Sequence, residues 1–220
     1  MKIRPYQPED QEHWLNVVAL AYMRSQFRDQ ISDVRDTYGE EDGYQAVIQL
    51  VAVIDEQIVG AIDAGVFNDD RMQHDIYVQN RGRGSYIELF AVDPARQGQG
   101  IGQALITVCL AALRQNGADV VEIFTRSDPA ANSLYQKLGG QEIAHNWRAL
   151  ATPKSYQFPR VKWQLDPATQ TLVLSGAQGR LSVLPTYPQW FTFFTEAAMA
   201  DFDVEEVYQE RTYFLALSHN

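Results

Sequence analysis

The chain has 220 residues, of which 45% are hydrophobic and 21% are charged, a composition typical of a globular protein that builds its core without disulfides. Its formal net charge of −10 does not provide the basic face that nucleic-acid binding requires. An acidic chain favours cationic partners, although a surplus of acids also serves solubility alone.

The first third of the chain predicts a strand, a helix and a hairpin. Lys2–Tyr6 is the strand, and the helix begins at Pro8 and carries apolar side chains at the 3.6-residue period. Arg28–Gly43 is polar and weakly periodic, so we expect a loop with some helix, which Tyr44–Gln49 closes. The hairpin is expected in Ile48–Phe67, where two β-rich runs flank a short polar turn.

The middle of the chain alternates strands with helices. Ser85–Val92 and Ala118–Thr125 predict strands, and Ile101–Gln115 between them predicts a helix. A second helix begins at Asp128 and ends at a double glycine, and Gln141–Ala151 returns as a strand. A hairpin combined with two strand–helix–strand crossovers predicts an α+β domain whose central sheet is mixed.

The pattern changes after residue 152, so we expect a domain over residues 1–152 and a C-terminal extension over 153–220. The extension predicts a hairpin, an aromatic-rich helix in Pro188–Phe202 and a final strand. Its aromatic residues form either a second small core or an association surface. A self-associating strand at Arg211–Leu217 would make a homodimer.

The cysteine content and the N-terminus bear on location. Cys109 is the only cysteine, which excludes an intrachain disulfide and a cysteine metal site, and its apolar surroundings predict a buried core residue rather than a nucleophile. The N-terminal residues are polar, and no apolar stretch approaches a membrane span. We therefore expect a cytoplasmic protein without a signal peptide or membrane helix.

Three glycines stand at alternate positions, Gly98, Gly100 and Gly102, where the helix predicted from residue 101 begins, in the segment RQGQGIGQALI. The first amides of a helix have no intrahelical partners and attract anions, so the segment is either a phosphate site or simply a turn. A Walker loop requires a lysine that is missing, and a dinucleotide fingerprint requires glycine where Gln103 stands. The pattern that fits is Q/R-x-x-G-x-G/A, with Gln97, Gly100 and Gly102 in register.

With its preceding strand YIELFAVDP, this segment resembles the acetyl-CoA binding segment of the GNAT superfamily of N-acetyltransferases. KIRPYQPED at residues 2–10 is similar to the usual first strand and helix start, and DPAANSLYQKLGGQEI at 128–143 is similar to a later motif. The resemblance covers roughly residues 1–152. It implies a GNAT-like mixed sheet flanked by helices, with acetyl-CoA as co-substrate and no metal.

The resemblance also implies which residues hold the coenzyme. These are Ala91, Val92, Arg96, Gln97, Gly98, Gln99, Gly100, Ile101, Gly102, Gln103, Asn132 and Tyr135. The main chain of Gln97–Gly102 would bind the pyrophosphate. Arg96 is either a phosphate partner or a solvated loop residue, and Asn132 either contacts the coenzyme or lies on a helix surface. Asp128 replaces the asparagine common in the family and is expected to cap its helix.

Transfer of an acetyl group from a thioester releases a thiolate, and a nearby acid that protonates it lowers the barrier. A tyrosine in the later motif is the usual candidate in the superfamily, and the resemblance assigns this role to Tyr135. The alternative is a packing role, because Leu134 and Leu138 lie on the same helix.

The attacking amine must lose a proton, and Glu88 is the expected base because it interrupts the apolar strand Ser85–Val92. Strict alternation would place Tyr86, Phe90 and Val92 on its side of the strand. The alternatives are a solvent-facing role for Glu88, Glu122 as the base, or a water molecule. His74 is expected to be exposed to solvent.

The acceptor site is expected near the loop Arg28–Gly43, which carries six acids. In the superfamily this region commonly borders the acceptor, and an acidic border suits a polyamine, an aminoglycoside or a basic peptide end. The charges alternatively form a solvated face. We therefore predict direct ternary-complex transfer of an acetyl group to a primary amine of a small molecule or peptide. The alternative is a non-catalytic acyl-CoA sensor or interaction module.

Overall fold

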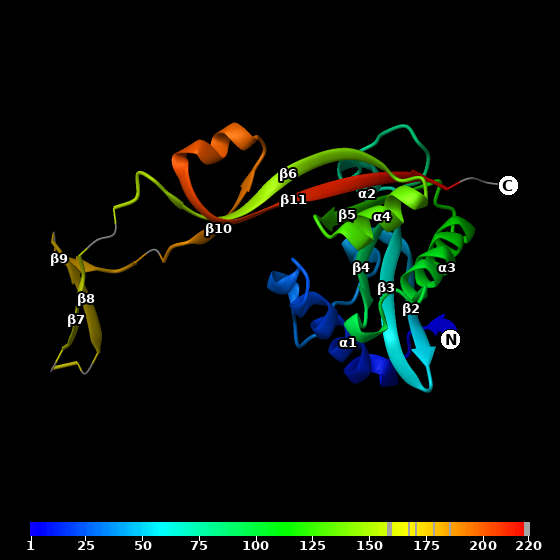
Figure 1. Ribbon diagram of the computed structural model, residues 1–220, viewed down its shortest axis with the longest axis horizontal. Coiled ribbons are helices and arrows are strands. Elements are labelled where there is room, and N and C mark those ends of the chain that lie inside the picture. The colour runs from blue at the N-terminus through cyan, green and yellow to red at the C-terminus, as the bar shows by residue number, and fades with distance from the viewer. Residues whose placement is uncertain (158–159, 167, 170, 178, 185, 218–220) are drawn as a thin grey trace. The chain divides into compact units, whose positions relative to one another are not determined.

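The computed structural model describes residues 1–157, 160–166, 168–169, 171–177, 179–184 and 186–217. The chain divides into two compact units, one formed by Met1–His145 with the chain from Glu210 onward and the other by Asn146–Gln209. Strands β6 (Gln141–Pro153) and β11 (Phe202–Ala216) contribute residues to both units (Figure 1).

The first unit contains a mixed sheet in the order β1-β2-β3-β4-β5-β11. Only β4 and β5 pair in parallel, and the other neighbours are antiparallel. The remaining strands of this unit are β1 (Lys2–Pro5), β2 (Tyr44–Ile54), β3 (Gln57–Phe67), β4 (Ser85–Val92) and β5 (Val120–Arg126). Its α-helices are α1 (Gln11–Met23), α2 (Arg71–His74), α3 (Ile101–Gln115) and α4 (Pro129–Lys137), and its 3-10 helices are η1 (Pro8–Asp10), η2 (Arg28–Gln30), η3 (Glu40–Asp42) and η4 (Pro94–Arg96).

The hairpin β2–β3 confirms one prediction and corrects another. It turns at Asp55 and Glu56, whose positive φ angles of 49° and 63° match the right-handed twist of a two-residue hairpin. Tyr44–Gln49, predicted to close a helix, instead begins β2. The prediction was wrong because pairing with the distant residues Asp63–Phe67 of β3 overrides local periodicity.

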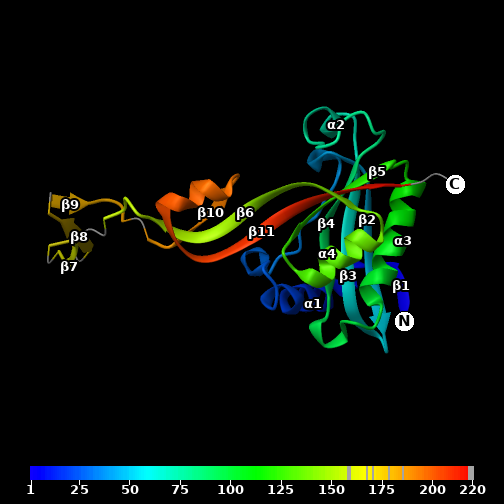
Figure 2. The same ribbon diagram turned by 45° about the horizontal axis from the view of Figure 1, so that its top comes forward.

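Helices cover both faces of the sheet of the first unit (Figure 2). Helix α1 packs on one face through Trp14, Val17 and Val18, which form a cluster with β2, β3 and β4. Helices α3 and α4 contribute to a larger cluster that includes β2, β3, β5 and β11. Cys109 lies in this second cluster with 0% exposure, as predicted for a core residue, and burial raises the pKa of its thiol to about 12.

The second unit contains short strands and an aromatic cluster. Strand β10 (Gln189–Phe193) pairs with β6, and the three-stranded sheet consists of β7 (Lys162–Leu165), β8 (Leu172–Gly176) and β9 (Gly179–Leu181). The predicted helix Pro188–Phe202 is wrong in its first half, because pairing with β6 makes residues 189–193 a strand. A 3-10 helix, η5 (Glu196–Asp201), follows it.

Several aromatic side chains of the extension pack against one another, whereas Phe194 is 81% exposed. Phe202 lies 5.0 Å from Phe191 and 4.9 Å from Phe193 between ring centroids. Trp190 packs at 5.6 Å on the buried Tyr208.

The predicted C-terminal strand is present as β11, and its residues Glu210–Ala216 pair antiparallel with Val120–Arg126 of β5. The edge of β11 is therefore paired with β5 of the same chain. This pairing gives no support to the homodimer predicted through a self-associating strand at Arg211–Leu217. No helix of the described ranges is long and apolar enough to span a membrane.

Candidate active site

A pocket of about 370 Å³ lies where strands β4 and β5 meet helices α1, α3 and α4. It is lined by Ala21, Tyr22, Ser25, Phe27, Phe90, Ala91, Val92, Arg96, Gln97, Gly98, Gly100, Ile101, Gly102, Gln103, Thr125, Asp128, Ala130, Ala131 and Leu134. Nine of the predicted coenzyme-binding residues are among them, from Ala91 to Gln103 with Gln99 missing. Asn132, Tyr135 and Glu88 do not line this pocket.

The pocket opens because β4 and β5 diverge. Their parallel register contains one residue pair, Tyr86 with Glu122. Further along, Phe90 of β4 and Thr125 of β5 line the pocket. Parallel strands normally continue an even ladder of hydrogen bonds, so a ladder this short leaves a wedge between the two strands.

A β-bulge lies at Glu88. In the pairing of β3 with β4, Asp63 is opposite Leu89 and Ala64 is opposite Ile87, so Glu88 is the extra residue. Ile87 and Phe90 pack in the core cluster of α3, whereas Leu89 and Ala91 pack in the α1 cluster.

The bulge corrects the predicted alternation of this strand. Phe90 and Val92 pack with α3, whereas Tyr86 packs in an aromatic cluster with Tyr44 and Phe67. Strict alternation fails because a bulge inserts one residue and reverses the sides beyond it. The predicted grouping of Glu88 with Phe90 and Val92 was therefore wrong.

The glycine segment adopts the backbone that its sequence predicts. Gly98 and Gly100 have φ angles of +77° and +80°, in the left-handed region that favours glycine. Gly100 is the N-cap of α3 and provides no side-chain cap. Within the described chain, no main-chain N–H from Gln99 to Gln103 has a protein acceptor, and Ala104 is the first to donate, to Gly100 O at 3.0 Å.

These features fit a pyrophosphate. Several neighbouring N–H groups at a helix N-terminus bind an anion through hydrogen bonds and the helix dipole. A Cβ on Gly98 or Gly100 would project into open space, and one on Gly102 would lie 3.3 Å from the Phe90 ring. Gly102 therefore allows close packing of α3 on β4, while Arg96 lines the same pocket and can add a cation.

Tyr135 lies on α4 with 4% of its surface exposed, and its ring packs 5.8 Å from that of Tyr213. Burial raises the pKa of its phenol well above the ordinary value, so it is protonated at neutral pH. Its neighbour Leu134 lines the pocket, and no described residue forms a hydrogen bond with the Tyr135 hydroxyl.

Glu88 is held inside an aromatic and charged cluster. The Tyr44 hydroxyl donates a short hydrogen bond to Glu88 Oε1, and Arg71 Nη1 lies 3.6 Å from the same oxygen. The Arg71 guanidinium lies 4.5 Å from the ring centroids of both Tyr44 and Phe67. The Glu88 side chain remains 21% exposed, so its carboxylate is fixed in place and still accessible.

Glu122, the alternative base, is tied to a loop. Its Oε1 accepts hydrogen bonds from the main-chain N–H groups of Tyr77 and Val78 at 2.9 and 3.0 Å. Burial raises the pKa of Glu122, and these two bonds oppose that rise. The residue is fully buried, so it anchors the loop after α2. His74, in that region, is exposed as predicted.

Asn132 is occupied by protein partners. Its Nδ2 donates to Arg126 O and Asp128 O, both at 2.6 Å, and its Oδ1 accepts from the Tyr213 hydroxyl at 2.9 Å. Its amide therefore joins β5, α4 and β11. Asp128 caps α4 as predicted, accepting from Ala131 N at 2.9 Å.

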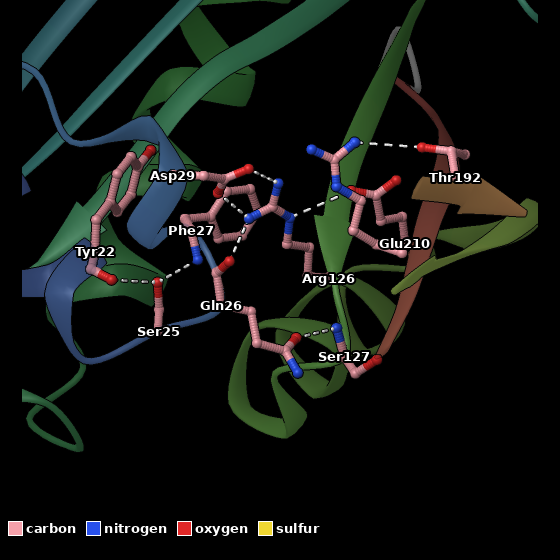
Figure 3. A network of polar contacts seen from close by, with 10 residues as sticks. Tyr22, Ser25, Gln26, Phe27, Asp29, Arg126, Ser127, Thr192 and Glu210 are labelled. Atoms are coloured by element: carbon pink, nitrogen blue, oxygen red, sulfur yellow. Dashed lines mark hydrogen bonds and ion pairs between the residues drawn. The ribbon is translucent and has the colours of Figure 1, made fainter. Parts of the chain in front are cut away.

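One wall of the pocket depends on a network that the sequence did not predict (Figure 3). Arg126 donates to both carboxylate oxygens of Asp29, at 2.5 and 3.0 Å, and to the carbonyl of Gln26. Its guanidinium lies 4.5 Å from the ring centroid of Phe27, which lines the pocket. The only sequence signal is an arginine at the end of an apolar strand.

A second unpredicted contact fixes the acidic loop Arg28–Gly43. Arg35 Nη2 donates to Asp63 Oδ2 at 2.8 Å, and both side chains are buried. The guanidinium lies 4.0 Å from the Tyr6 ring centroid and 4.9 Å from that of Trp14. Burial raises the pKa of Asp63 to about 6, against the opposing effect of Arg35.

A profile of the acetyltransferase (GNAT) family matches residues 13–140. The chain belongs to this family. It is an N-acetyltransferase, and enzymes of the family use acetyl-CoA, so the predicted family, fold class and enzyme class are confirmed. Among the described residues, no group of three His, Cys, Asp or Glu side chains could hold a metal ion.

Solved structures share the fold of this GNAT chain. The ribosomal-protein-S18-alanine N-acetyltransferase of Escherichia coli is 15% identical, with a TM-score of 0.52 over 100% of this chain and 95% of that one. A ribosomal-protein-alanine N-acetyltransferase of Brucella melitensis is 15% identical, with a TM-score of 0.55 over 98% and 99%. An N-acetyltransferase of Staphylococcus aureus Mu50 is 13% identical, with a TM-score of 0.55 over 99% and 98%. No curated protein matches the chain in sequence.

Proposed function

We propose that this GNAT enzyme transfers the acetyl group of acetyl-CoA directly to a primary amine, at the wedge between β4 and β5. The observation that carries the proposal is the pocket there, whose glycine segment offers main-chain N–H groups from Gln99 to Gln103 that have no acceptor among the described residues. Direct transfer requires both substrates to be bound at once in a reactive orientation. Holding them in that orientation is the main way in which such a site accelerates the reaction.

Acetyl-CoA supplies the activated acetyl thioester. The N–H groups at the start of α3, with Arg96, would bind its pyrophosphate. The apolar side chains of Phe90, Val92 and Leu134 would line the pantetheine arm, because they border the same pocket. Asn132 is proposed to support this wall through its bonds to the main chain and Tyr213, rather than to contact the coenzyme.

Tyr135 is proposed as the acid that protonates the leaving thiolate. Burial keeps its phenol protonated at neutral pH, and its hydroxyl has no partner among the described residues that would compete for the proton. Tyr135 directly follows Leu134, which lines the pocket. A phenol held beside a developing thiolate lowers the barrier to its departure.

Glu88 is proposed as the group that receives the amine proton, directly or through water. Its carboxylate is accessible and oriented by Tyr44 and Arg71, whereas Glu122 is buried and bonded to two loop amides. The bulge projects Glu88 toward the aromatic cluster of β2 and β3. A base oriented by two fixed neighbours is suited to proton abstraction.

The acceptor is proposed to be a cationic amine, as a small molecule or a peptide end. Tyr44, which is hydrogen-bonded to Glu88, packs in one aromatic cluster with Tyr38 and Tyr86, and tyrosine faces with a carboxylate attract an ammonium group. The Arg71 guanidinium packs on the Tyr44 ring and gives that side of the cluster a positive charge. The acid-rich loop that contributes Tyr38 is held in place by the buried Arg35–Asp63 pair.

The test is release of free coenzyme A thiol when the protein is incubated with acetyl-CoA and a panel of polyamines, aminoglycosides and peptides. We expect saturable release that depends on one class of amine. Tyr135→Phe should lower kcat by on the order of 100-fold while coenzyme affinity, measured by calorimetry, stays within about two-fold. Binding without release across the panel would instead indicate an acyl-CoA sensor, and unchanged kcat in the variant would remove Tyr135 from the mechanism.

A further inference from the structure

The three-stranded sheet of the second unit, β7–β9, has one continuous apolar face. Directly opposed residues of antiparallel strands share a face, and the register pairs Trp163 with Leu174, Leu165 with Leu172, and Leu174 with Leu181. These five residues define the apolar face: Trp163, Leu165, Leu172, Leu174 and Leu181.

The opposite face carries the charges. Lys162, Ser175 and Arg180 follow one another across the three strands, and Gln164 lies opposite Val173. Lys162 and Arg180 are the only charged residues of β7, β8 and β9. The apolar face therefore contains no charge.

Within the second unit, the apolar face is exposed. Trp163 is 57% exposed, Leu165 58% and Leu172 62%. No described helix of the second unit covers this sheet in either ribbon view (Figures 1 and 2). Monomeric proteins rarely leave a contiguous apolar patch of this kind uncovered, and a small sheet needs packing on its apolar face for stability.

We propose that the apolar face binds the same face of a second copy of the chain, so that two β7–β9 sheets stack about a two-fold axis. Aligned sheets pack about 10 Å apart through interlocking side chains, and a two-fold interface requires a self-complementary surface. The uncharged face meets that requirement, because identical copies meet there without like-charge repulsion. Lys162 and Arg180 then remain in water on the outer faces.

The size of the face sets the strength of the contact. Strands of four residues at about 3.3 Å per residue, spaced by about 4.8 Å, give three strands a face of roughly 13 by 14 Å. Two such faces bury less than the roughly 1,200 Å² that marks the lower limit of standard interfaces. We therefore expect a reversible dimer with a dissociation constant in the micromolar range. This inference does not depend on the proposed catalytic roles.

Sedimentation velocity of the full chain, from about 1 μM to about 100 μM, tests the proposal. The wild type should shift from monomer to dimer across this range. Leu172→Lys should weaken self-association at least ten-fold, because it places two cations in a dry interface. Gln164→Lys makes the same charge change on the polar face and should associate like the wild type. Both substitutions are at exposed positions, so circular dichroism should show the native fold in both variants.

Three outcomes would overturn the proposal. One is a wild type that stays monomeric across the whole concentration range. If a quencher does not reach Trp163 in that monomer, the same chain covers the apolar face; if it does reach Trp163, the face stays exposed, and either result overturns the dimer. Another is a dimer that Leu172→Lys leaves unchanged. The last is equal loss of association in Leu172→Lys and Gln164→Lys, which would attribute the effect to net charge instead of to the apolar face.

Discussion

Removal of the Arg35 guanidinium by Arg35→Met should leave a buried carboxylate without its cation. Asp63 is 1% exposed, and Arg35 Nη2 lies 2.8 Å from its Oδ2. Methionine fills most of the space between Tyr6 and Trp14 but carries no charge. The expected consequence is a further rise in the pKa of Asp63, because only Arg35 opposes the effect of burial there.

The magnitude follows from the protonation of Asp63. Its pKa is about 6 in the native chain and 3.8 for an ordinary aspartate, so native Asp63 binds its proton more tightly than unfolded Asp63. Its contribution to the free energy of unfolding is therefore greatest below about pH 4 and is lost as the pH rises to about 6. With about 1.4 kcal/mol per pH unit, the loss is about 3 kcal/mol in the wild type.

In Arg35→Met this loss continues above pH 6. We expect the stability deficit of the variant to grow by about 1.4 kcal/mol per pH unit between pH 6 and pH 8. Below pH 5 the deficit should shrink to about 1–2 kcal/mol, the value of the lost packing and cation–π contacts of Arg35.

Urea denaturation followed by circular dichroism at pH 5, 6, 7 and 8 measures this difference. The matched control is the double variant Arg35→Met with Asp63→Asn, in which no carboxylate remains at this site to titrate. Its deficit relative to the wild type should therefore stay nearly constant between pH 6 and pH 8, where wild-type Asp63 has already lost its proton. A deficit of Arg35→Met that is constant from pH 5 to pH 8, or one that the double variant reproduces, would refute the reasoning.

Gly100→Ala should weaken coenzyme A binding roughly five- to ten-fold in calorimetry, because a left-handed φ of +80° costs alanine about 1–2 kcal/mol. The control Gly39→Ala, at an extended φ of −161°, should not weaken binding. Equal effects of the two substitutions would contradict a role for the Gly100 backbone in binding. Arg126→Met should raise the KM for acetyl-CoA roughly ten-fold with little change in kcat, because it releases Asp29 and the pocket wall beside it; an unchanged KM would exclude this support role. Asn132→Ala should lower the free energy of unfolding by about 2–4 kcal/mol in urea titrations, since it leaves buried groups unpaired. If Asn132→Ala instead lowered the affinity for the coenzyme without lowering the free energy of unfolding, Asn132 would be assigned to the coenzyme-binding site.

Local sequence was sufficient for several parts of the site. The glycine segment was predictable because positive φ angles and an uncapped helix start are properties of a few consecutive residues. Helices α3 and α4 were predictable from periodicity and from the Asp128 cap. The burial of Tyr135 is consistent with the apolar residues Leu134 and Leu138 on the same helix. Its role as the acid stays a prediction.

Tertiary structure decided the rest, because it depends on residues that are distant in sequence. Tyr44–Gln49 became a strand through pairing with β3, and the bulge at Glu88 exists only in relation to that same neighbour.

The sequence by itself determined the α+β class and the helix that opens with glycines, since these rest on backbone preferences and periodicity within short segments. The kind of chemistry expected there came from the resemblance of two motifs to the GNAT superfamily. The fold decided which carboxylate is accessible: Glu122 is sequestered by loop amides while Glu88 is presented by a bulge. It also joined Arg126 to Asp29 across 97 residues and gave Asn132 partners on β5 and β11. Hydrogen bonds and ion pairs of this kind depend on proximity in space, which no local pattern encodes.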